Sequence, residues 1–496
     1  MAEAGCNGLN YSRVDTLLLQ QVLNILQEES VLETGPNDAV VNFQHPFKLK
    51  ESWIFQELGV AASTEEKLVE AMREVIQHSV KTHHPLFLNQ LYGGTDPYGL
   101  AAAWLTEALN TNQHTFEVAP VFTIIERSVI GRLLYQLGYE DGDGIFTAGG
   151  SMANMYAMVL ARYKTCPEVK KQGLWSCCPL AVFVSSESHY SFLKAAHWLG
   201  LGLDSVYEVA CDREGRMLPD ALHTKVREAV DQGKLPFFVN ATAGTTVLGA
   251  FDPFNAIADI CEKFNIWFHI DACWGGAVMF SKKYNYLLQG AERSDSIAWN
   301  PHKMLGAPLQ CSVILLKNKD LLHQCNSSGA TYLFQQDKFY DTSYDLGDKS
   351  VQCGRKPDSF KLWLMWRARG DAGFGLLVDK AMELSKYFLK MITSIEEFRL
   401  VLPEFQFTNI CFWYIPKCLQ SLPETEEWWD RVGKVAPLIK EKIVLKGSLM
   451  IAYQPLKQRK LPNFFRLVLT CHPEHTECDL DRVIEEITIA GNNIQV

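Results

Sequence analysis

The sequence has neither a long apolar run nor an excess of basic residues. No stretch approaches the ~18 consecutive apolar residues of a membrane-spanning helix, so we expect no membrane span. The first residues, MAEAGCNGLNYSRVD, contain no basic segment followed by an apolar one, and we expect no secretory signal. The formal net charge of −10 argues against nucleic acid or an acidic membrane surface as the main partner.

Paired-cysteine motifs are also absent. The 14 cysteines are scattered, and the closest pair is the adjacent Cys177 and Cys178. Without Cys-x-x-Cys pairs or the Cys/His spacing of a metal site, the pattern predicts reduced thiols, no bound metal and a cytoplasmic location. Cys6 is close enough to the N-terminus for lipidation, but an unmodified cysteine is the simpler interpretation.

The N-terminal region is predicted to be helical. A chain of 496 residues is too long for one ordinary hydrophobic core, which predicts two or three domains. Residues 15–31 and 64–80 place apolar side chains at helical spacing, and the second stretch starts with a helix-capping pattern. We therefore expect a helical segment over 1–94. Such a segment needs a surface to pack on, and a partner subunit at a dimer interface would supply one.

Between 95 and 375, short apolar runs alternate with helical patterns, which predicts a large α/β domain. The predicted strands are 180–186, 236–242, 266–272, 296–300 and 312–318, and 251–265 is a predicted crossover helix. Continuously apolar strands separated by helices indicate a mainly parallel sheet with both faces covered. The tail, 376–496, combines a long helical pattern, strand-like NICFWYI and FFRLVLT, and a last helix, so we expect a smaller α+β domain there.

Polar side chains stand at the ends of three of these apolar runs. Asp271 ends IWFHID, Lys303 follows SIAWNPH, and His189 follows LAVFVSS by a few residues. Singly, each has an ordinary interpretation: a helix cap or ion-pair partner, a surface lysine, a structural histidine. The carboxyl ends of parallel strands share one edge of the sheet, however, and α/β enzymes place their chemistry there.

A glycine turn before a helix, FTAGGSMANMYAM, adds a candidate phosphate site. The backbone N–H groups of Gly150 and Ser151 would point at an anion from the helix start, although the G-x-G-x-x-G spacing of a dinucleotide site is missing. The segment ATAGTTV contributes two hydroxyls, Thr245 and Thr246, at the same edge. A phosphate cradle, a histidine facing a ring, a carboxylate for a pyridine nitrogen and a lysine are together what a pyridoxal 5′-phosphate site requires.

These motifs resemble those of the group II pyridoxal phosphate-dependent decarboxylases, and the resemblance extends over almost the full chain. It is carried by NQLYGGTDPYGL, GDGIFTAGGSMANMYAM, ATAGTTVLGAFDP, HIDACWGG, WNPHKMLGAPLQC and NFFRLVLT, in the family's order. Within the family, the chain is most similar to the branch that decarboxylates acidic amino acids. The resemblance implies an α/β architecture of fold type I, like that of aspartate aminotransferase, and a homodimer with active sites at the interface.

The resemblance also implies roles for individual residues. Lys303 would bind the cofactor covalently, Asp271 would pair with its pyridine nitrogen, and His189 would stack on its ring. Tyr332, on a loop with which this family reaches the neighbouring subunit's site, would protonate Cα after decarboxylation. The other implied cofactor contacts are Gly150, Ser151 and Asn300 at the phosphate, and Thr246 and His302 beside the cofactor.

The same resemblance implies how the substrate is recognised. Arg466 in NFFRLVLT and Gln90 would bind its distal acid group, and the fork of arginine suits a carboxylate or a sulfinate. Tyr92 stands where the glutamate decarboxylases have a small residue, and His114 where they have phenylalanine. Tyr92 would therefore shorten the pocket and favour aspartate or cysteine sulfinate over glutamate, although Asn112 matches the glutamate enzymes.

The motifs HIDACWGG and GAPLQC are most similar to those of arthropod aspartate 1-decarboxylases. The expected reaction is therefore α-decarboxylation of L-aspartate to β-alanine, of L-cysteine sulfinate to hypotaurine, or of both. Decarboxylation of glutamate to γ-aminobutyrate stays open as an alternative. Two other classes also stay open: a catalytically silent homologue that acts as a binding subunit, and a pyridoxal phosphate aminotransferase, which would release no carbon dioxide.

Overall fold

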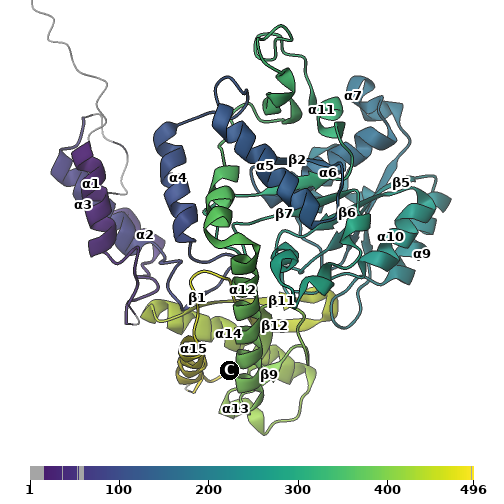
Figure 1. The fold of residues 1–496 in the computed structure, drawn as a ribbon. Coiled ribbons are helices and arrows are strands. Elements are labelled where there is room, and N and C mark those ends of the chain that lie inside the picture. Colours follow the sequence, from purple (N-terminus) through teal and green to yellow (C-terminus); the bar gives the residue numbers. More distant parts are fainter. Residues whose placement is uncertain (1–15, 36, 53, 55–57, 59–60, 493) are drawn as a thin grey trace, which may run out of the picture.

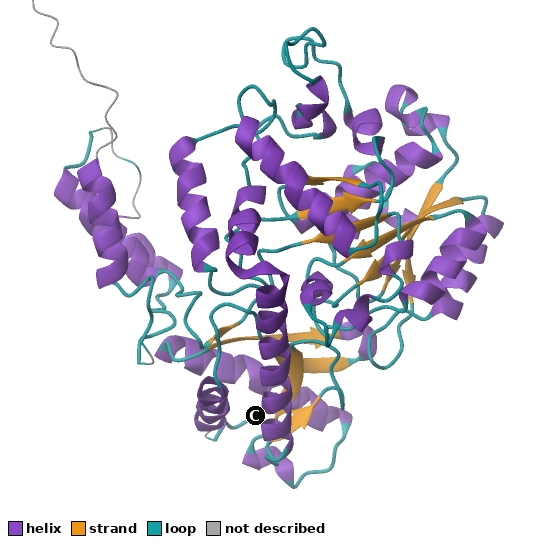
Figure 2. Cartoon of the chain, viewed as in Figure 1, coloured by secondary structure: helices purple, strands orange, loops and turns teal. Residues whose placement is uncertain are grey.

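Two β-sheets with helices packed around them form the computed structural model of the chain (Figure 1). The structure describes residues 16–35, 37–52, 54, 58, 61–492 and 494–496, so Cys6 lies outside the described residues. One sheet has seven strands and the other has five, and Figure 2 shows helices around both. This is the α/β architecture that the sequence predicts.

The larger sheet is mainly parallel, as predicted. In spatial order its strands are β2 (Asp143–Phe146), β8 (Val313–Leu316), β7 (Ser296–Trp299), β6 (Trp267–Asp271), β5 (Leu235–Thr242), β3 (Leu180–Ser185) and β4 (Val206–Val209). The pairs from β7 to β4 are parallel, whereas β8 runs antiparallel to both of its neighbours. The apolar pattern of β8 predicted a strand but not its direction, because both directions bury the same side chains.

Successive side chains of β3 point to opposite faces of this sheet, and both sets are apolar, which explains why helices cover both faces. Leu180, Val182 and Val184 pack in one apolar cluster with α6, α8 and α11, and Ala181 and Phe183 pack in another with α5, α9, α10 and α12. A strand that is apolar throughout is stable only when both faces are removed from water. The helices are α5 (Pro120–Gln136), α6 (Gly150–Thr165), α8 (Ser191–Trp198), α9 (Pro219–Asp231), α10 (Phe254–Phe264), α11 (Leu321–Asn326) and α12 (Ser359–Thr393). The predicted crossover helix is confirmed as α10.

The smaller sheet joins distant parts of the sequence. In spatial order its strands are β1 (Phe87–Leu88), β11 (Met450–Leu456), β12 (Leu461–Val468), β10 (Asn409–Tyr414) and β9 (Phe398–Leu400). The helices α13 (Lys417–Gln420), α14 (Glu426–Lys446) and α15 (Glu477–Gly491) belong to the same part of the chain. The strands and the last helix predicted for the tail are therefore present. The boundaries placed after residues 94 and 375 stay a prediction, and α12 runs through the second of them.

Both predicted N-terminal helices are present, as α1 (Thr16–Glu28) and α3 (Glu65–His78). Helix α2 (Pro46–Glu51) lies between them in the sequence, and α4 (Pro97–Leu109) follows α3. The Thr64 side chain caps α3 by accepting a hydrogen bond from the Lys67 backbone N–H (3.5 Å). Arg73 of α3 pairs with Glu29 (2.8 Å), next to the end of α1. In the part of the chain that the structure describes, none of the helices has both the length and the apolar composition that a bilayer span needs.

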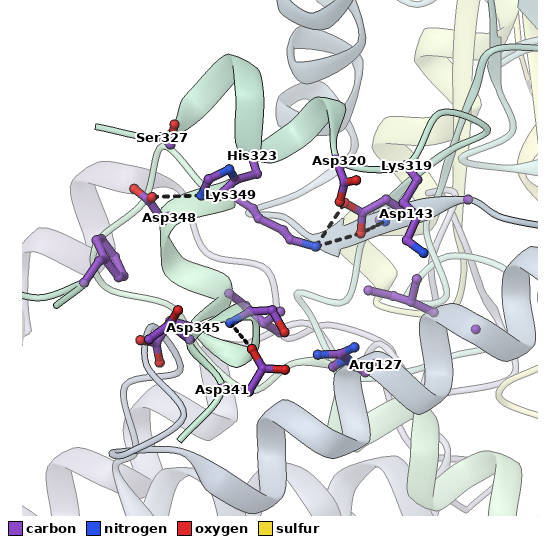
Figure 3. A pocket seen from close by; sticks show the side chains of 18 of the residues that line it. Arg127, Asp143, Lys319, Asp320, His323, Ser327, Asp341, Asp345, Asp348 and Lys349 are labelled. Carbon is purple, nitrogen blue, oxygen red and sulfur yellow. Dashed lines mark hydrogen bonds and ion pairs between the residues drawn. The ribbon is translucent and has the colours of Figure 1, made fainter. Parts of the chain in front are cut away.

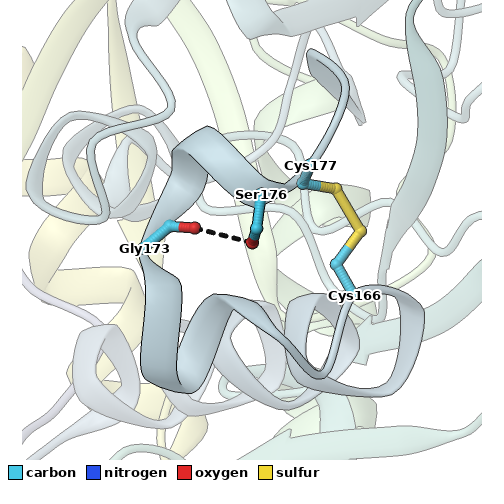
Figure 4. Close-up of a disulfide and its surroundings, with 4 residues drawn as sticks. All are labelled: Cys166, Gly173, Ser176 and Cys177. Carbon is cyan, nitrogen blue, oxygen red and sulfur yellow. Dashed lines mark hydrogen bonds between the residues drawn. A yellow bond between two sulfur atoms is a disulfide. The ribbon is translucent and has the colours of Figure 1, made fainter.

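The prediction of reduced thiols is wrong for one pair of cysteines. Cys166 and Cys177 form a disulfide between the end of α6 and the segment that leads into β3 (Figure 4). Their Cα atoms lie 6.4 Å apart, within the ordinary range for a disulfide. The two cysteines are 11 residues apart in the sequence, and this spacing is not a recognisable cysteine motif. The helix–turn–strand geometry brings the two sulfurs together, and that geometry is set by the sheet.

Candidate active site

The predicted cofactor residues line one cavity of about 220 Å³ at the carboxyl ends of β3, β5, β6 and β7. The structure brings all of them together there: Gly150, Ser151, His189, Thr246, Asp271, Asn300, His302 and Lys303. The cavity is also lined by Asn154, Tyr190, Thr242, Gly244, Cys273 and Trp274. Parallel strands thus gather at one rim side chains that are far apart in the sequence.

Asp271 is a buried carboxylate at the end of β6 with two hydrogen-bond donors. The Asn154 amide donates to Oδ2 (2.9 Å) and the Cys273 backbone N–H donates to Oδ1 (3.1 Å). Burial by itself would raise the pKa of this carboxyl, but the Lys303 charge, the Cys273 hydrogen bond, His189 and Asn154 together hold the pKa below its ordinary value. Asp271 is therefore ionised at neutral pH although it is buried.

A relay of buried polar groups holds Asn154 in place. The Trp267 indole N–H donates to Ser296 Oγ (2.8 Å), and Ser296 Oγ contacts His269 Nδ1 (2.8 Å). His269 Nε2 contacts Asn154 Oδ1 (3.0 Å), which leaves the Asn154 NH2 group to donate to Asp271. Burial lowers the pKa of His269 to about 4, so this imidazole is neutral and acts as a fixed hydrogen-bonding element.

Sequence reasoning missed Asn154, His269 and Ser296. The signal for His269 was present, because a residue two positions before Asp271 on a strand points to the same face of the sheet. No signal connected Asn154 to Asp271, since the contact joins α6 to β6 over 117 residues. Thr245 was expected at the cavity, but its hydroxyl accepts a hydrogen bond from the Ala250 backbone N–H within its own turn (3.0 Å).

The N-terminus of α6 approaches Asn300 and Cys273 closely at the place predicted to bind phosphate. Gly149, which precedes the helix, has a φ of 106°, a conformation that favours glycine. A Cβ atom on Gly150 would lie 2.6 Å from Asn300 Nδ2 and 2.6 Å from Cys273 Sγ, so any larger residue would require these two side chains to move. Asn300 is held by Ser312, whose hydroxyl donates to Asn300 Oδ1 (2.5 Å), so that its amide nitrogen faces the helix start.

His189 and Lys303 enter the same cavity from the ends of β3 and β7. His189 Nδ1 accepts a hydrogen bond from the Ser191 backbone N–H (3.2 Å), which leaves Nε2 to carry the proton of the neutral ring. Burial lowers the pKa of His189, Asp271 opposes that effect, and Lys303 adds to it. The backbone N–H of Lys303 donates to the Asn300 carbonyl (3.0 Å), which fixes the turn that follows β7.

Arg466 is a buried cation next to the cavity. Arg466 on β12 is 7% exposed, and its side chain donates to the backbone carbonyls of Thr246 (Nη1, 2.9 Å) and Asn89 (Nη2, 3.4 Å). Its Nε is buried and has no hydrogen-bond partner in the described structure. Burial lowers the pKa of the guanidinium. A buried guanidinium that contacts only carbonyls is well suited to bind an anion.

The other predicted substrate residues, and the predicted proton donor Tyr332, do not line the cavity of this chain. Tyr92 packs against Phe87, with ring centroids 5.9 Å apart, and Gln90 is exposed. Asn112 Oδ1 accepts a hydrogen bond from the Arg355 backbone N–H (2.9 Å). The remaining two are His114, whose carbonyl accepts from the Gly347 backbone N–H (2.8 Å), and Tyr332, which is 79% exposed. Their roles stay predictions.

A larger cavity of about 840 Å³ lies elsewhere, lined in part by the chain between Ser327 and Lys349 (Figure 3). Many of its charges are matched within the protein. Lys349 Nζ lies 3.0 Å from both carboxylate oxygens of Asp143, and His323 Nε2 lies 3.2 Å from Asp348. This cavity contains none of the predicted cofactor residues, so we place the chemistry in the smaller one.

Pyridoxal 5′-phosphate fits the groups of the smaller cavity. The phosphate needs an anion site, and the start of α6 with the Asn300 amide provides one. The pyridine nitrogen needs a carboxylate that stays ionised when buried, as Asp271 does. The aldehyde needs an amine, and Lys303 lies in the same cavity. Among the described residues, no group of three or more His, Cys, Asp or Glu side chains is arranged to hold a metal ion.

Comparison with known sequences agrees with this chemistry. Residues 51–415, more than half of the chain, match the pyridoxal-dependent decarboxylase conserved domain. The chain is 48% identical to the acidic amino acid decarboxylase GADL1 of Bos taurus, over 96% of this chain and 91% of that protein. It is 47% identical to the cysteine sulfinic acid decarboxylase of Mus musculus, over 96% of each chain.

Solved structures support the same assignment. The crystal structure of mouse CSAD is 45% identical and superposes with a TM-score of 0.93, covering 97% of this chain and 99% of that one. The structure of Oryza sativa TDC with PLP and tryptamine, 21% identical with a TM-score of 0.85 over 99% of each chain, shares the fold. The architecture is therefore fold type I, as expected. The chain belongs to the pyridoxal-dependent decarboxylase family, and it is accordingly a carboxy-lyase with pyridoxal 5′-phosphate as its cofactor.

Proposed function

We propose that the protein removes the α-carboxyl group of short acidic amino acids, converting L-aspartate to β-alanine and L-cysteine sulfinate to hypotaurine. The observation that carries this proposal is Arg466, a buried guanidinium with a free Nε beside the cavity. A carboxylate or sulfinate on the substrate would supply the anion that this cation lacks. Relatives of this chain at 47–48% identity are named as decarboxylases of acidic amino acids and of cysteine sulfinic acid.

The residues of the cavity have distinct proposed tasks. Pyridoxal phosphate, when bound, supplies an electron-accepting ring that stabilises the charge left on Cα as carbon dioxide departs. Lys303 would hold the cofactor through its amine, and the buried carboxylate of Asp271 would keep the pyridine nitrogen protonated. His189 would pack against the ring and exclude water. The start of α6 and Asn300 would bind the phosphate, with Ser151, Thr246 and His302 completing the contacts.

We assign the protonation of Cα to the Tyr332 hydroxyl of a neighbouring subunit in a homodimer. Tyr332 is 79% exposed and lies outside the cavity of its own chain, which supports donation across an interface. Exposed apolar side chains on α4 and α5 would form part of that interface. They are Trp104, Leu105, Leu109, Val121 and Ile124.

The preference for short substrates rests on Tyr92. Its ring packs on Phe87, close to Asn89, whose carbonyl accepts a hydrogen bond from Arg466. The short segment that carries Tyr92 therefore contacts, through Asn89, the arginine that we assign to the distal acid group. Asn112, which argued for glutamate, uses its side-chain oxygen to bind the Arg355 backbone N–H, and this contact favours a structural role. Glutamate decarboxylation to γ-aminobutyrate is the second candidate.

A competition assay tests the substrate. The enzyme with added pyridoxal phosphate receives equal concentrations of aspartate, cysteine sulfinate and glutamate, and the amine products are separated and quantified. We expect β-alanine and hypotaurine to dominate. The variant Tyr92→Ser should raise the share of γ-aminobutyrate by about tenfold, since one methylene of fit is worth ~1–3 kcal/mol. The exposed Tyr286→Ser is the matched control and should leave the ratios unchanged.

The same assay separates the other candidates. If γ-aminobutyrate dominates in the wild type, the short-pocket interpretation of Tyr92 is wrong, while the reaction class survives. A protein that retains its cofactor but forms no amine from any of the three acids is a silent homologue. Conversion of an added keto acid, one for one with the amino acid and without carbon dioxide, would identify an aminotransferase.

A further inference from the structure

The Cys166–Cys177 disulfide closes a short surface segment outside the active site. Residues 167–176 form the segment, which contains α7 (Val169–Gln172) and the turn where the Ser176 hydroxyl donates to the Gly173 carbonyl (2.9 Å; Figure 4). α7 has no buried residue, so packing alone fixes it weakly. Both cysteines are half-buried, within reach of a small thiol.

This segment contacts the base of the loop that carries Tyr332. We call residues 327–341, between α11 and the turn at 342–344, the Tyr332 loop. Lys170 of α7 donates from Nζ to the carbonyls of Gln324 (2.9 Å) and Ser327 (3.1 Å). Gln324 lies in α11, and Ser327 is the first residue of the loop. Lys170 therefore fixes the point where the loop leaves the helix.

A second set of contacts at the loop base comes from parts of the chain outside the segment closed by the disulfide. The Asn326 amide donates to the Lys349 carbonyl (2.9 Å). Asp348 accepts from the Ser328 backbone N–H (3.1 Å) and pairs with His323 (3.2 Å), as Figure 3 shows for the ion pair. The base is thus held by two sets of contacts, and only the set made by Lys170 depends on the position of α7.

We propose that the Cys166–Cys177 disulfide is a reversible redox site that controls the mobility of the Tyr332 loop through Lys170. With the bridge intact, the closed segment holds α7 against the loop base. With the bridge reduced, α7 gains freedom, its hydrogen bonds to the two carbonyls weaken, and the loop opens more often. The effect on catalysis rests on the role of Tyr332 in the proposed function, whereas the effect on the loop does not.

The reductant is a thiol such as glutathione. Its thiolate attacks one cysteine sulfur, the S–S bond breaks, and the other cysteine leaves as a thiolate that takes up a proton. A second glutathione thiolate attacks the glutathione sulfur of this mixed disulfide, and the bound cysteine leaves as a thiolate that takes up a proton, so that both cysteines end as thiols and the two glutathione molecules as their disulfide. Two electrons and two protons are transferred to the protein. The neighbouring Cys178, which is exposed and free, takes no part in this balance.

Chymotrypsin cleavage of the loop tests the proposal on the full-length holoenzyme without substrate. Tyr332 and Phe339 are both exposed and report loop opening. The protein is equilibrated in glutathione buffers from reducing to oxidising, the Cys166–Cys177 bridge is quantified by alkylation and mass measurement, and cleavage rates are compared. We expect reduction to raise the cleavage rate roughly three- to tenfold, the factor that one or two hydrogen bonds contribute to an equilibrium.

Matched variants identify the route. Cys166→Ser/Cys177→Ser and Lys170→Met should both be cleaved fast in every buffer, the second with its bridge still responding to glutathione. Cys178→Ser and Lys171→Met, changes at neighbouring exposed residues, should behave like the wild type. The proposal is overturned if the bridge forms in no buffer, or if it forms and the cleavage rate stays constant. If reduction changes the cleavage rate of the loop but not the rate of carbon dioxide release, the result supports the redox site and counts against the role of Tyr332.

Discussion

Asn154 connects two buried polar groups at the cavity, because its side chain hydrogen-bonds to both His269 and Asp271. Replacing it with alanine removes one donor from the Asp271 carboxylate and leaves His269 Nε2 without its partner. The free energy of unfolding of the apoprotein should fall by ~1–3 kcal/mol at pH 7, the usual cost of unpairing a buried polar group. Urea titration measures this change, and Asn285→Ala, at an exposed asparagine outside the cavity, is the control.

The pH dependence of that variant follows from the sign of the shift at Asp271. The folded protein lowers the pKa of this carboxyl, so its stabilising contribution is present above the unfolded pKa of about 4 and is lost as the pH falls through the lower folded value. Removing the Asn154 donor raises the folded pKa, and the contribution is then lost at a higher pH. If the free energy of unfolding fell with decreasing pH in the same way for the variant and the wild type, this role of Asn154 would be contradicted.

Arg466 tests substrate recognition independently of cofactor binding. Arg466→Met keeps the length and apolar body of the side chain but removes the charge. The KM for aspartate and cysteine sulfinate should rise roughly 10²- to 10³-fold, as expected for losing a charge-assisted pair of hydrogen bonds. Cofactor absorbance should stay normal, and Arg399→Met, at the exposed partner of Glu424, should change neither. An unchanged KM would show that the distal acid group binds elsewhere.

Helix α6 links the fold to the site, because its first residue must approach Asn300 and Cys273 closely. Gly150→Ala would force these groups apart. Such overpacking costs ~1–3 kcal/mol, and cofactor affinity should fall roughly 10- to 100-fold. Gly131→Ala in α5 is the matched control: its Cβ would meet no atom within 4 Å, and alanine suits a helix better, so stability should rise slightly. Equal cofactor affinity in the two variants would argue against a cradle at Gly150.

Sequence patterns predicted the elements well and the contacts between elements only partly. The five apolar runs are β3, β5, β6, β7 and β8 in the structure. Residues that follow the four parallel strands, β3, β5, β6 and β7, share one cavity because parallel strands end at one edge. The antiparallel direction of β8, the Asn154–His269 relay and the Cys166–Cys177 bridge were missed. Each depends on a tertiary distance, and no local spacing in the sequence encodes that distance.

At the scale of the whole molecule, a single chain holds Lys303 in its cavity and Tyr332 on its exterior, so in the proposed homodimer a complete site would need both subunits. Lys303→Ala and Tyr332→Phe should each abolish or nearly abolish formation of the amine product in the pure state. Co-expressed in equal amounts, half of the dimers would be mixed, and each mixed dimer would have one site with both residues intact. Activity should therefore return to about a quarter of the wild-type value, because subunits pair at random in a symmetric dimer.

The alternative arrangement makes the opposite prediction. If Tyr332 folds back into the cavity of its own chain, every chain in the mixture carries a defective site, and co-expression restores nothing. Size-exclusion chromatography of the mixture, with differently tagged subunits, shows whether mixed dimers have formed. Recovered activity that follows the mixed-dimer fraction places Tyr332 in the partner's site. If mixed dimers form and activity does not recover, the reaction class of the family still holds, but the proton on Cα comes from a donor within the same chain.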